Sequence, residues 1–257
     1  MTALKNEGRK AFITYTTAGL PDMETTKKIM FAQQEAGIDV MELGIPFSDP
    51  VADGSVIQAA SYEAIQKGAT LTKIFTLMKE VRKEGLTTPV VFMMYYNTVY
   101  HYGLEEFVEM CADCGVDGLI IPDLPYEEQK EINAVLAENE AAPILIQLVS
   151  PVSKQRIPMI VNNARGFVYC VSQMGVTGNG ANFHKQIREY LLEVKKNSPV
   201  PVMMGFGIRT AGDVEPLEDI IDGAIVGSHF ITLMKENNYD ENVIKEYISS
   251  FKKEMNE

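Results

Sequence analysis

The chain has 257 residues, of which 46% are hydrophobic and 23% are charged, and its formal net charge at pH 7 is −12. This charge disfavours nucleic acids and anionic membranes as partners, because both are themselves negative. No apolar run approaches the roughly 20 residues of a membrane-spanning helix, the first residues show no signal-peptide pattern, and three cysteines favour a reducing cytoplasm over a disulfide framework.

Short apolar runs alternate with helical patterns along the whole chain. The runs are rich in Val, Ile, Phe and Tyr, and they begin near Ala11, Val40, Val90, Gly118, Ile144, Phe167, Val202 and Ala224. The helical patterns are Met23–Ala36, Val56–Lys67, Leu71–Lys83, Leu104–Cys114, Glu127–Glu138, Lys154–Asn162, His184–Lys196, Ala211–Asp219, Phe230–Lys235 and Asn242–Lys253. This alternation predicts a parallel sheet with helices on both faces.

No Gly/Ser linker or block of charge divides the chain, so residues 1–257 are predicted to form a single domain. Eight strands in this length favour an α/β fold of the (β/α)8 TIM-barrel type with extra helices. Periodicity alone leaves an open parallel sheet as the alternative.

In a barrel of this kind, functional residues lie where the strands end and in the loops that follow. Glycines gather after the last two runs, at Gly205, Gly207 and Gly227, and Ser228 adds a hydroxyl. They predict a phosphate site built from backbone N–H groups and a helix N-terminus. The alternative is that they only form tight strand-to-helix turns.

Glu42 is a lone carboxylate inside an apolar run, and none of the eight runs contains a Lys or Arg to pair with it. A buried carboxyl group without a cation has a raised pKa, which suits a general acid–base residue. Asp53 follows shortly after it, although Asp-Gly is also common in turns and Asp is a common helix N-cap. Turn roles are favoured more strongly for Asp49 and Asp123. The Cys111 to Cys114 spacing indicates a helix face rather than a zinc site.

The sequence lacks the usual electron sinks of a phosphosugar aldolase, a lysine Schiff base or a metal held by histidines. No lysine lies in a strand run, and His101, His184 and His229 have no metal-ligand spacing. Such a site suits a substrate that carries its own electron sink. Indole is one, since protonation of its C3 gives an iminium-like cation.

The segment LGIPFSDPVADG at Leu43–Gly54, preceded by Glu42, resembles the signature of the tryptophan synthase alpha subunit family. VSQMGVTG at Val171–Gly178, GFGI at Gly205–Ile208 and DGAIVGS at Asp222–Ser228 match the family's other motifs in order. The resemblance implies cleavage of indole-3-glycerol phosphate to indole and D-glyceraldehyde 3-phosphate by a cytoplasmic chain without a cofactor or metal of its own. It also implies an alpha2-beta2 heterotetramer with a pyridoxal-phosphate beta subunit that consumes the indole.

The resemblance also implies roles for particular residues. Glu42 corresponds to the group that protonates indole C3 and takes the proton of the glycerol hydroxyl, and Asp53 to the one that stabilises the indole N–H. The residues of the indole slot are Met93, Tyr95, Ile120, Ile146 and Tyr169. The residues around the phosphate are Gly178, Phe206, Gly207, Gly227 and Ser228, with Thr177 to Ala181 at the start of a lid that excludes water.

Three positions depart from the common family pattern: Tyr15 stands where Phe is frequent, Ser55 where Pro is frequent, and Gln173 where Arg is frequent. They bear on substrate fit and on the lid rather than on the catalytic pair. Two alternatives stay open, another phosphate-binding TIM-barrel lyase or isomerase and a weakly catalytic regulatory subunit that activates a beta partner. The apolar loop Pro46–Ala52 either docks that partner or folds back over the barrel mouth.

Overall fold

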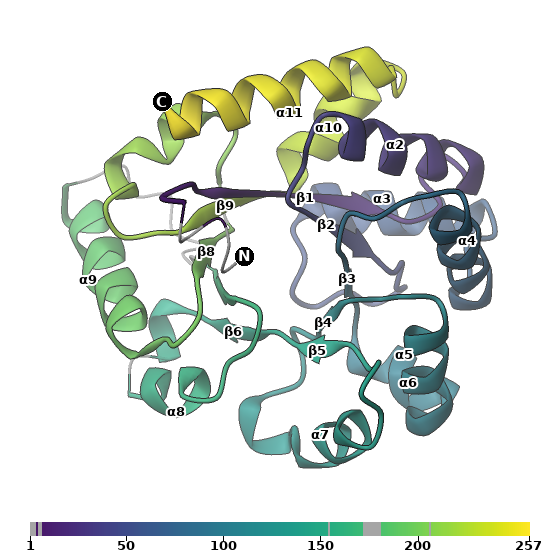
Figure 1. Ribbon diagram of the computed structural model, residues 1–257, viewed down its shortest axis with the longest axis horizontal. Coiled ribbons are helices and arrows are strands. Elements are labelled where there is room, and N and C mark those ends of the chain that lie inside the picture. The colour runs from purple at the N-terminus through teal and green to yellow at the C-terminus, as the bar shows by residue number, and fades with distance from the viewer. Residues whose placement is uncertain (1–3, 5–6, 154, 172–180, 206) are drawn as a thin grey trace.

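Parallel strands form a barrel at the centre of the molecule, and helices surround it (Figure 1). The computed structural model describes residue 4 and residues 7–153, 155–171, 181–205 and 207–257. Each predicted apolar run forms a strand that starts within one residue of the predicted position. The strands are β1 (Ala11–Thr17), β2 (Val40–Gly44), β3 (Val90–Met93), β4 (Gly118–Ile120), β5 (Ile144–Leu145), β6 (Gln147–Val149), β7 (Val168–Cys170), β8 (Val202–Met204) and β9 (Gly223–Val226).

The sheet closes on itself at Ile146. Its strands pair in parallel in the order β5-β4-β3-β2-β1-β9-β8-β7-β6, so β5 and β6 stand at the two ends of the row. These two strands are halves of one predicted run, separated only by Ile146, whose N–H donates to the Leu119 carbonyl oxygen at 2.8 Å. The ends of the row are therefore continuous, and the structure confirms a TIM barrel rather than an open sheet.

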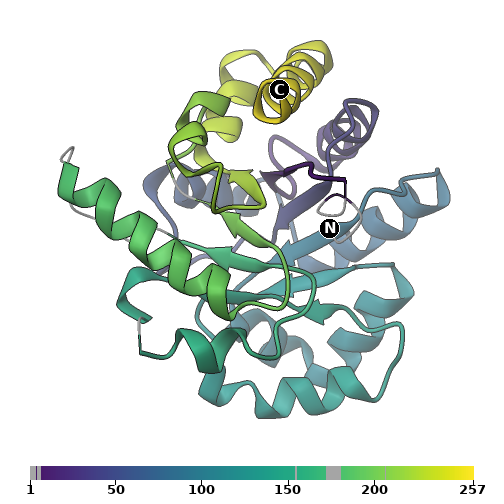
Figure 2. The same cartoon turned by 60° about the vertical axis from the view of Figure 1, so that its left-hand side comes forward.

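The α-helices form a shell around the barrel. They are α2 (Met23–Glu35), α3 (Ser55–Gln66), α4 (Leu71–Lys83), α5 (Tyr96–Tyr102), α6 (Leu104–Asp113), α7 (Lys130–Ala137), α8 (Ile157–Val161), α9 (Ala181–Asn197), α10 (Ser228–Glu236) and α11 (Glu241–Asn256). Short 3-10 turns are η1 (Tyr126–Glu128), η2 (Pro151–Ser153), η3 (Ala211–Asp213) and η4 (Glu215–Leu217). Figure 2 shows the last helix (yellow) beside α2 (purple), so the two ends of the chain complete one shell.

Side chains alternate along the strands between the barrel interior and the shell. Ala11 and Ile13 of β1 and Val40 of β2 belong to the interior cluster. The intervening Phe12 and Met41 pack in the outer core beneath the helices. This alternation determines which side chains near the strand ends point into the barrel mouth.

The predicted helix over Ala211–Asp219 is wrong, because that segment forms the two 3-10 turns η3 and η4. The Asp213 carboxylate accepts hydrogen bonds from the backbone N–H groups of Arg209 (2.8 Å) and Thr210 (2.9 Å), which tightens the chain locally. Pro216 then has no N–H to donate to a continuing helix.

Two helical segments near β3 and β6 also differ from the prediction. Helix α5 was not predicted, and its first N–H, at Tyr96, donates to the Asp123 carboxylate at 2.9 Å. That cap comes from a separate loop, which local periodicity does not indicate. The helix predicted over Lys154–Asn162 is shorter, since α8 begins at Ile157 with Pro158 in its first turn. Lys154 itself lies outside the described residues.

Candidate active site

Glu42 lies in the barrel interior near the carboxyl end of β2, in register with Tyr15 of β1 and Val91 of β3. Only 1% of the residue is exposed, and neither carboxyl oxygen has a hydrogen-bond partner among the described residues. Burial and, secondarily, the charge of Asp53 raise the pKa of Glu42 from 4.5 to about 8, because both disfavour the ionised form. Glu42 is therefore mostly protonated near neutral pH and can give or take a proton there.

Asp53 lies in the loop between β2 and α3 and is partly buried. The N-cap residue of α3 is Gly54, so the helix-cap alternative for Asp53 is wrong. Burial raises the pKa of Asp53, and a hydrogen bond with the Tyr95 side chain partly offsets this. The structure thus places Glu42 and Asp53 close enough for the charge of Asp53 to raise the pKa of Glu42. Two nearby carboxyl groups in different environments can take different acid–base roles.

Two tyrosines lie over glycines in the barrel mouth. A Cβ added at Gly44 would lie 2.0 Å from the Tyr15 hydroxyl oxygen, and one added at Gly205 would lie 2.6 Å from the Tyr169 ring. Glycine at these two positions is what allows each ring to lie against the neighbouring strand. Burial raises the pKa of both phenols, and the charges of the two site carboxyl groups add to the effect. Both hydroxyl groups therefore stay protonated.

Tyr95 connects the loop after β2 to the end of β3. Its hydroxyl oxygen accepts a hydrogen bond from the N–H of Ala52 at 2.9 Å, next to Asp53. Its ring stacks on Phe47, with centroids 5.1 Å apart and planes at 24°. Phe47 therefore folds back over the barrel mouth, whereas Val51 in the same loop is 84% exposed.

The apolar residues predicted for the indole slot converge in the barrel interior. Met93, Ile120, Ile146 and Tyr169 all belong to or pack against the interior cluster. A cavity of about 460 Å³ opens at the carboxyl ends of the strands, and Met93 lies in its lining. Glu42 is not among the residues that line this cavity.

The predicted phosphate residues that the structure describes lie at the ends of β8 and β9. Gly207 has a φ of +69°, a left-handed conformation that favours glycine. Gly227 is the N-cap residue of α10 and Ser228 is its first residue, so the positive end of that helix dipole is at this edge. Thr177, Gly178 and Phe206 lie outside the described residues, as does Gln173.

Sequence reasoning missed the side chains and glycines that support the tyrosines. Gly205 was predicted as part of the phosphate site and Gly44 was given no role of its own, although each occupies an inward position that a period of two along its strand identifies. Thr17, whose hydroxyl donates to the Tyr15 oxygen at 3.5 Å, and the stacking of Phe47 carry no local signal.

Cys111 and Cys114 are buried at the end of α6, which confirms the helix-face interpretation. Within the described ranges, no three His, Cys, Asp or Glu side chains are grouped so that they could hold a metal ion. Nor does that part of the chain contain a helix long and apolar enough to cross a membrane.

Comparisons with known proteins agree along the whole chain. A model of the family described as tryptophan synthase alpha chain matches residues 1–257. The tryptophan synthase alpha chain of Lachnospira eligens is 74% identical over 256 residues, which cover 100% of this chain and 97% of that one. That of Thermoanaerobacter sp. (strain X514) is 46% identical and covers 97% of this chain and 95% of that one. The crystal structure of tryptophan synthase subunit alpha from Legionella pneumophila has a TM-score of 0.88 at 32% identity, covering 99% and 95% of the two chains.

Proposed function

The chain belongs to the tryptophan synthase alpha chain family, and from this premise we propose that Glu42 and Asp53 carry out its reaction. The chain is a carbon–carbon lyase of tryptophan biosynthesis that cleaves indole-3-glycerol phosphate to indole and D-glyceraldehyde 3-phosphate. The observation that carries the assignment is a fully buried Glu42 carboxyl group without a partner among the described residues, beside a second carboxyl group.

In the proposed reaction Glu42 acts twice, first as a proton donor and then as a proton acceptor. Protonated Glu42 donates to C3 of the indole ring, and the ring becomes an iminium-like cation. The carboxylate of Glu42 then takes the proton of the adjacent glycerol hydroxyl, the C–C bond breaks, and its electron pair returns to the ring. The products are indole and the aldehyde, and Glu42 is protonated again. Asp53, as a carboxylate, accepts the indole N–H and stabilises the positive charge.

We assign the flat indole ring to the slot formed by Met93, Tyr95, Ile120, Ile146 and Tyr169. For the phosphate we assign Thr177 and Gly178 in the segment after β7, together with the turns after β8 and β9, which contain Phe206, Gly207, Gly227 and Ser228. No Lys or Arg lies in these turns before Arg209. Backbone N–H groups, the Ser228 hydroxyl and the start of α10 therefore have to bind the anion.

We also propose that the chain binds a tryptophan synthase beta subunit in an alpha2-beta2 heterotetramer. Three large apolar side chains are exposed at the carboxyl ends of the strands: Val51 (84%) after β2, Tyr100 (74%) after β3 and Val152 (81%) after β6. Because the strands are parallel, all three lie at the same end of the barrel. Apolar side chains grouped in this way favour a protein contact.

Three further assignments rest on the same premise. Pyridoxal phosphate belongs to the beta subunit, and this chain needs no cofactor because indole supplies its own electron sink. Residues 1–257 form one domain, which the pairing of β1 with β9 across the whole sequence supports. The compartment is the cytoplasm, with which the free thiols of Cys111, Cys114 and Cys170 are consistent.

The test is to incubate the purified chain with indole-3-glycerol phosphate, with and without a beta subunit, and to measure indole. Wild type should release indole in both cases, and variants at Glu42 or Asp53 should not. Release by the beta complex alone would favour the weakly catalytic regulatory alternative. Release that survives loss of both carboxyl groups would refute the proposed catalytic pair.

A further inference from the structure

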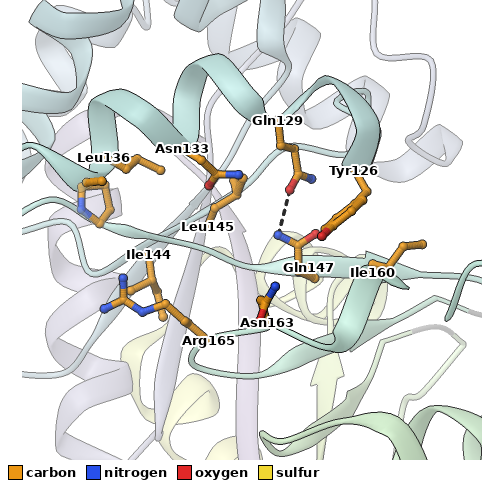
Figure 3. Close-up of a pocket in the computed structure, with 12 residues that line it drawn as sticks. Tyr126, Gln129, Asn133, Leu136, Ile144, Leu145, Gln147, Ile160, Asn163 and Arg165 are labelled. Atoms are coloured by element: carbon orange, nitrogen blue, oxygen red, sulfur yellow. Dashed lines mark hydrogen bonds between the residues drawn. The ribbon is translucent and has the colours of Figure 1, made fainter. Parts of the chain in front are cut away.

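The helical shell is thin where it covers β5 and β6. Helix α7 has eight residues, and α8, with five, is the shortest α-helix in the described part of the chain. At a rise of 1.5 Å per residue, five residues extend only about 7.5 Å. A cavity of about 250 Å³ lies between these helices and the outer face of the barrel (Figure 3). Glu42 does not line it, although Tyr126, Gln129, Gln147 and Ile160 also line the cavity at the barrel mouth.

Two buried amides meet in the lining of this cavity, Gln129 from the start of α7 and Gln147 from β6. Gln129 is 6% exposed and Gln147 is 7% exposed. The Gln147 amide nitrogen donates to the Gln129 oxygen at 2.9 Å, and the Gln129 nitrogen donates to the Leu124 carbonyl oxygen at 3.3 Å. The Gln147 side-chain oxygen accepts no hydrogen bond from the described residues. Among the described residues, the only buried side-chain N or O atoms without a partner are the two Glu42 oxygens. The Gln147 oxygen is therefore open to the cavity, where an N–H group of a ligand can donate to it.

A cation stands on the cavity wall beside these amides. Arg165 lines the cavity and is exposed, and it takes part in none of the ion pairs between described residues. The nearby Arg156 differs, because Glu127 neutralises it. Figure 3 shows the Arg165 side chain on the same wall as Ile144, across from α7. An unpaired guanidinium group is suited to a ligand carboxylate.

Leu136, Leu145 and Ile160 add apolar surface to the lining, and Asn133 and Asn163 add two further amides. Together these groups define a ligand: a flat apolar body, a carboxylate at one end and an N–H donor at the other. We propose that the cavity between α7 and α8 is a second binding site, for small planar carboxylates that bear an N–H group. This site depends neither on the lyase reaction nor on the roles assigned to Glu42 and Asp53.

The probe for this site is 2-aminobenzoate, which has the required groups and is fluorescent. The chain contains no Trp, so the emission of the bound probe is read without a tryptophan background. Wild type should bind the probe saturably. Benzoate lacks the N–H group and 2-aminobenzamide lacks the charge, and each should compete about 10-fold more weakly, as the loss of one charge-assisted or buried hydrogen bond implies.

Matched variants locate the bound probe. Arg165→Gln removes the cation and should weaken binding about 10-fold, and Ala137→Phe should fill the cavity and abolish binding. Lys130→Gln removes a charge from the same helix without touching the lining, so its affinity should stay within about twofold of wild type. Unchanged affinity in Arg165→Gln, complete displacement by glycerol 3-phosphate, or no saturable binding to wild type would each overturn the proposal.

Discussion

Glu42 combines two properties that normally exclude each other, a carboxyl group and complete burial without a partner among the described residues. A residue kept for stability alone would gain from a neutral isostere, whereas a proton carrier cannot be replaced. The distinction can be measured in a single variant.

Replacing Glu42 by Gln keeps the shape of the protonated side chain and removes its proton. General acid–base groups contribute roughly 10²–10⁴-fold, and one used for two transfers should lie near the top of this range. We expect kcat to fall at least about 10³-fold while the protein stays folded and binds glycerol 3-phosphate. Steady-state indole release and circular dichroism measure the two effects. A variant that retains a tenth of the wild-type kcat would contradict the assigned role.

The raised pKa of Glu42 also predicts how stability depends on pH. The folded state holds this proton up to about pH 8, whereas the unfolded chain releases it near pH 4.5. Between these values the folded state binds more protons, so the contribution is full below pH 4.5 and is lost as pH rises through 8. The slope is at most about 1.4 kcal/mol per pH unit for one group.

The Glu42→Gln variant lacks this contribution and is the matched control. Its Tm should rise relative to wild type as pH increases from about 5 to 9. Differential scanning calorimetry of both proteins across this range gives the difference directly. Parallel Tm curves would show that Glu42 ionises in the folded protein as it does in the unfolded chain.

A functional residue could be identified from the sequence only where the signal for it lies in the neighbouring sequence. Glu42 could be identified because the strand runs contain no Lys or Arg, a property of the sequence itself. The bond from the Ala52 N–H to the Tyr95 hydroxyl spans 43 positions, and no local pattern contains it. The roles assigned to Glu42 and Asp53 remain predictions that the variants above address.

At the scale of elements, the glycines in the turns after β8 and β9 differ in backbone conformation. A substitution therefore affects stability differently at the two positions. Gly207 has a positive φ, so any side chain there strains the backbone and lowers stability as well as binding. Gly227 has a φ of −109°, and an added Cβ would meet only ordinary contacts, the nearest being the Tyr15 Cβ at 3.6 Å. Gly227 is therefore the cleaner position at which to test the proposed phosphate site.

We expect Gly227→Asp to raise KM for indole-3-glycerol phosphate by about 10-fold or more, because a carboxylate at the start of α10 repels the phosphate. Its Tm should change little. Gly212→Asp is the control, since it adds the same charge in η3, where an added Cβ would meet only the Thr210 hydroxyl oxygen at 3.7 Å. Equal KM values for the two variants would argue against phosphate binding at α10.

Sequence periodicity predicted the strands well because each is a short, fully buried apolar run. It was weaker where an element depends on a distant group. The first N–H group of helix α5 donates to the carboxylate of Asp123. The helix predicted after β8 is replaced by 3-10 turns, which the hydrogen bonds to Asp213 and the missing N–H of Pro216 favour. Strand starts follow from composition, whereas these boundaries follow from tertiary contacts.

At the scale of the whole molecule, the loop between β2 and α3 connects the proposed partner surface to the site. Val51 is exposed on it, and two residues later the partly buried Asp53 lies close enough to Glu42 to raise the pKa of that group. A beta subunit that contacts Val51 should fix this loop and hold Asp53 in place, so it should raise kcat more than it lowers KM.

The coupling must be reciprocal, because a ligand that favours the ordered loop also favours the partner. Titrating a beta subunit into the chain by calorimetry should give tighter binding when glycerol 3-phosphate is present. Val51→Asp should weaken both titrations, whereas Leu192→Asp, exposed on α9, should not. Equal affinity with and without the phosphate, together with unchanged turnover at saturation, would show that the loop does not transmit the effect.

The closure of the barrel at Ile146 has a consequence for how this protein associates. A row of strands that returns to its own beginning has no free edge, so no N–H or C=O groups are left along an outer strand for another chain to pair with. The folded barrel therefore cannot bind another chain by strand addition, the mechanism by which many proteins capture peptides and fibrils grow. Any partner has to recognise side chains and loops, and a local opening at the single residue between β5 and β6 would be needed to expose a backbone edge.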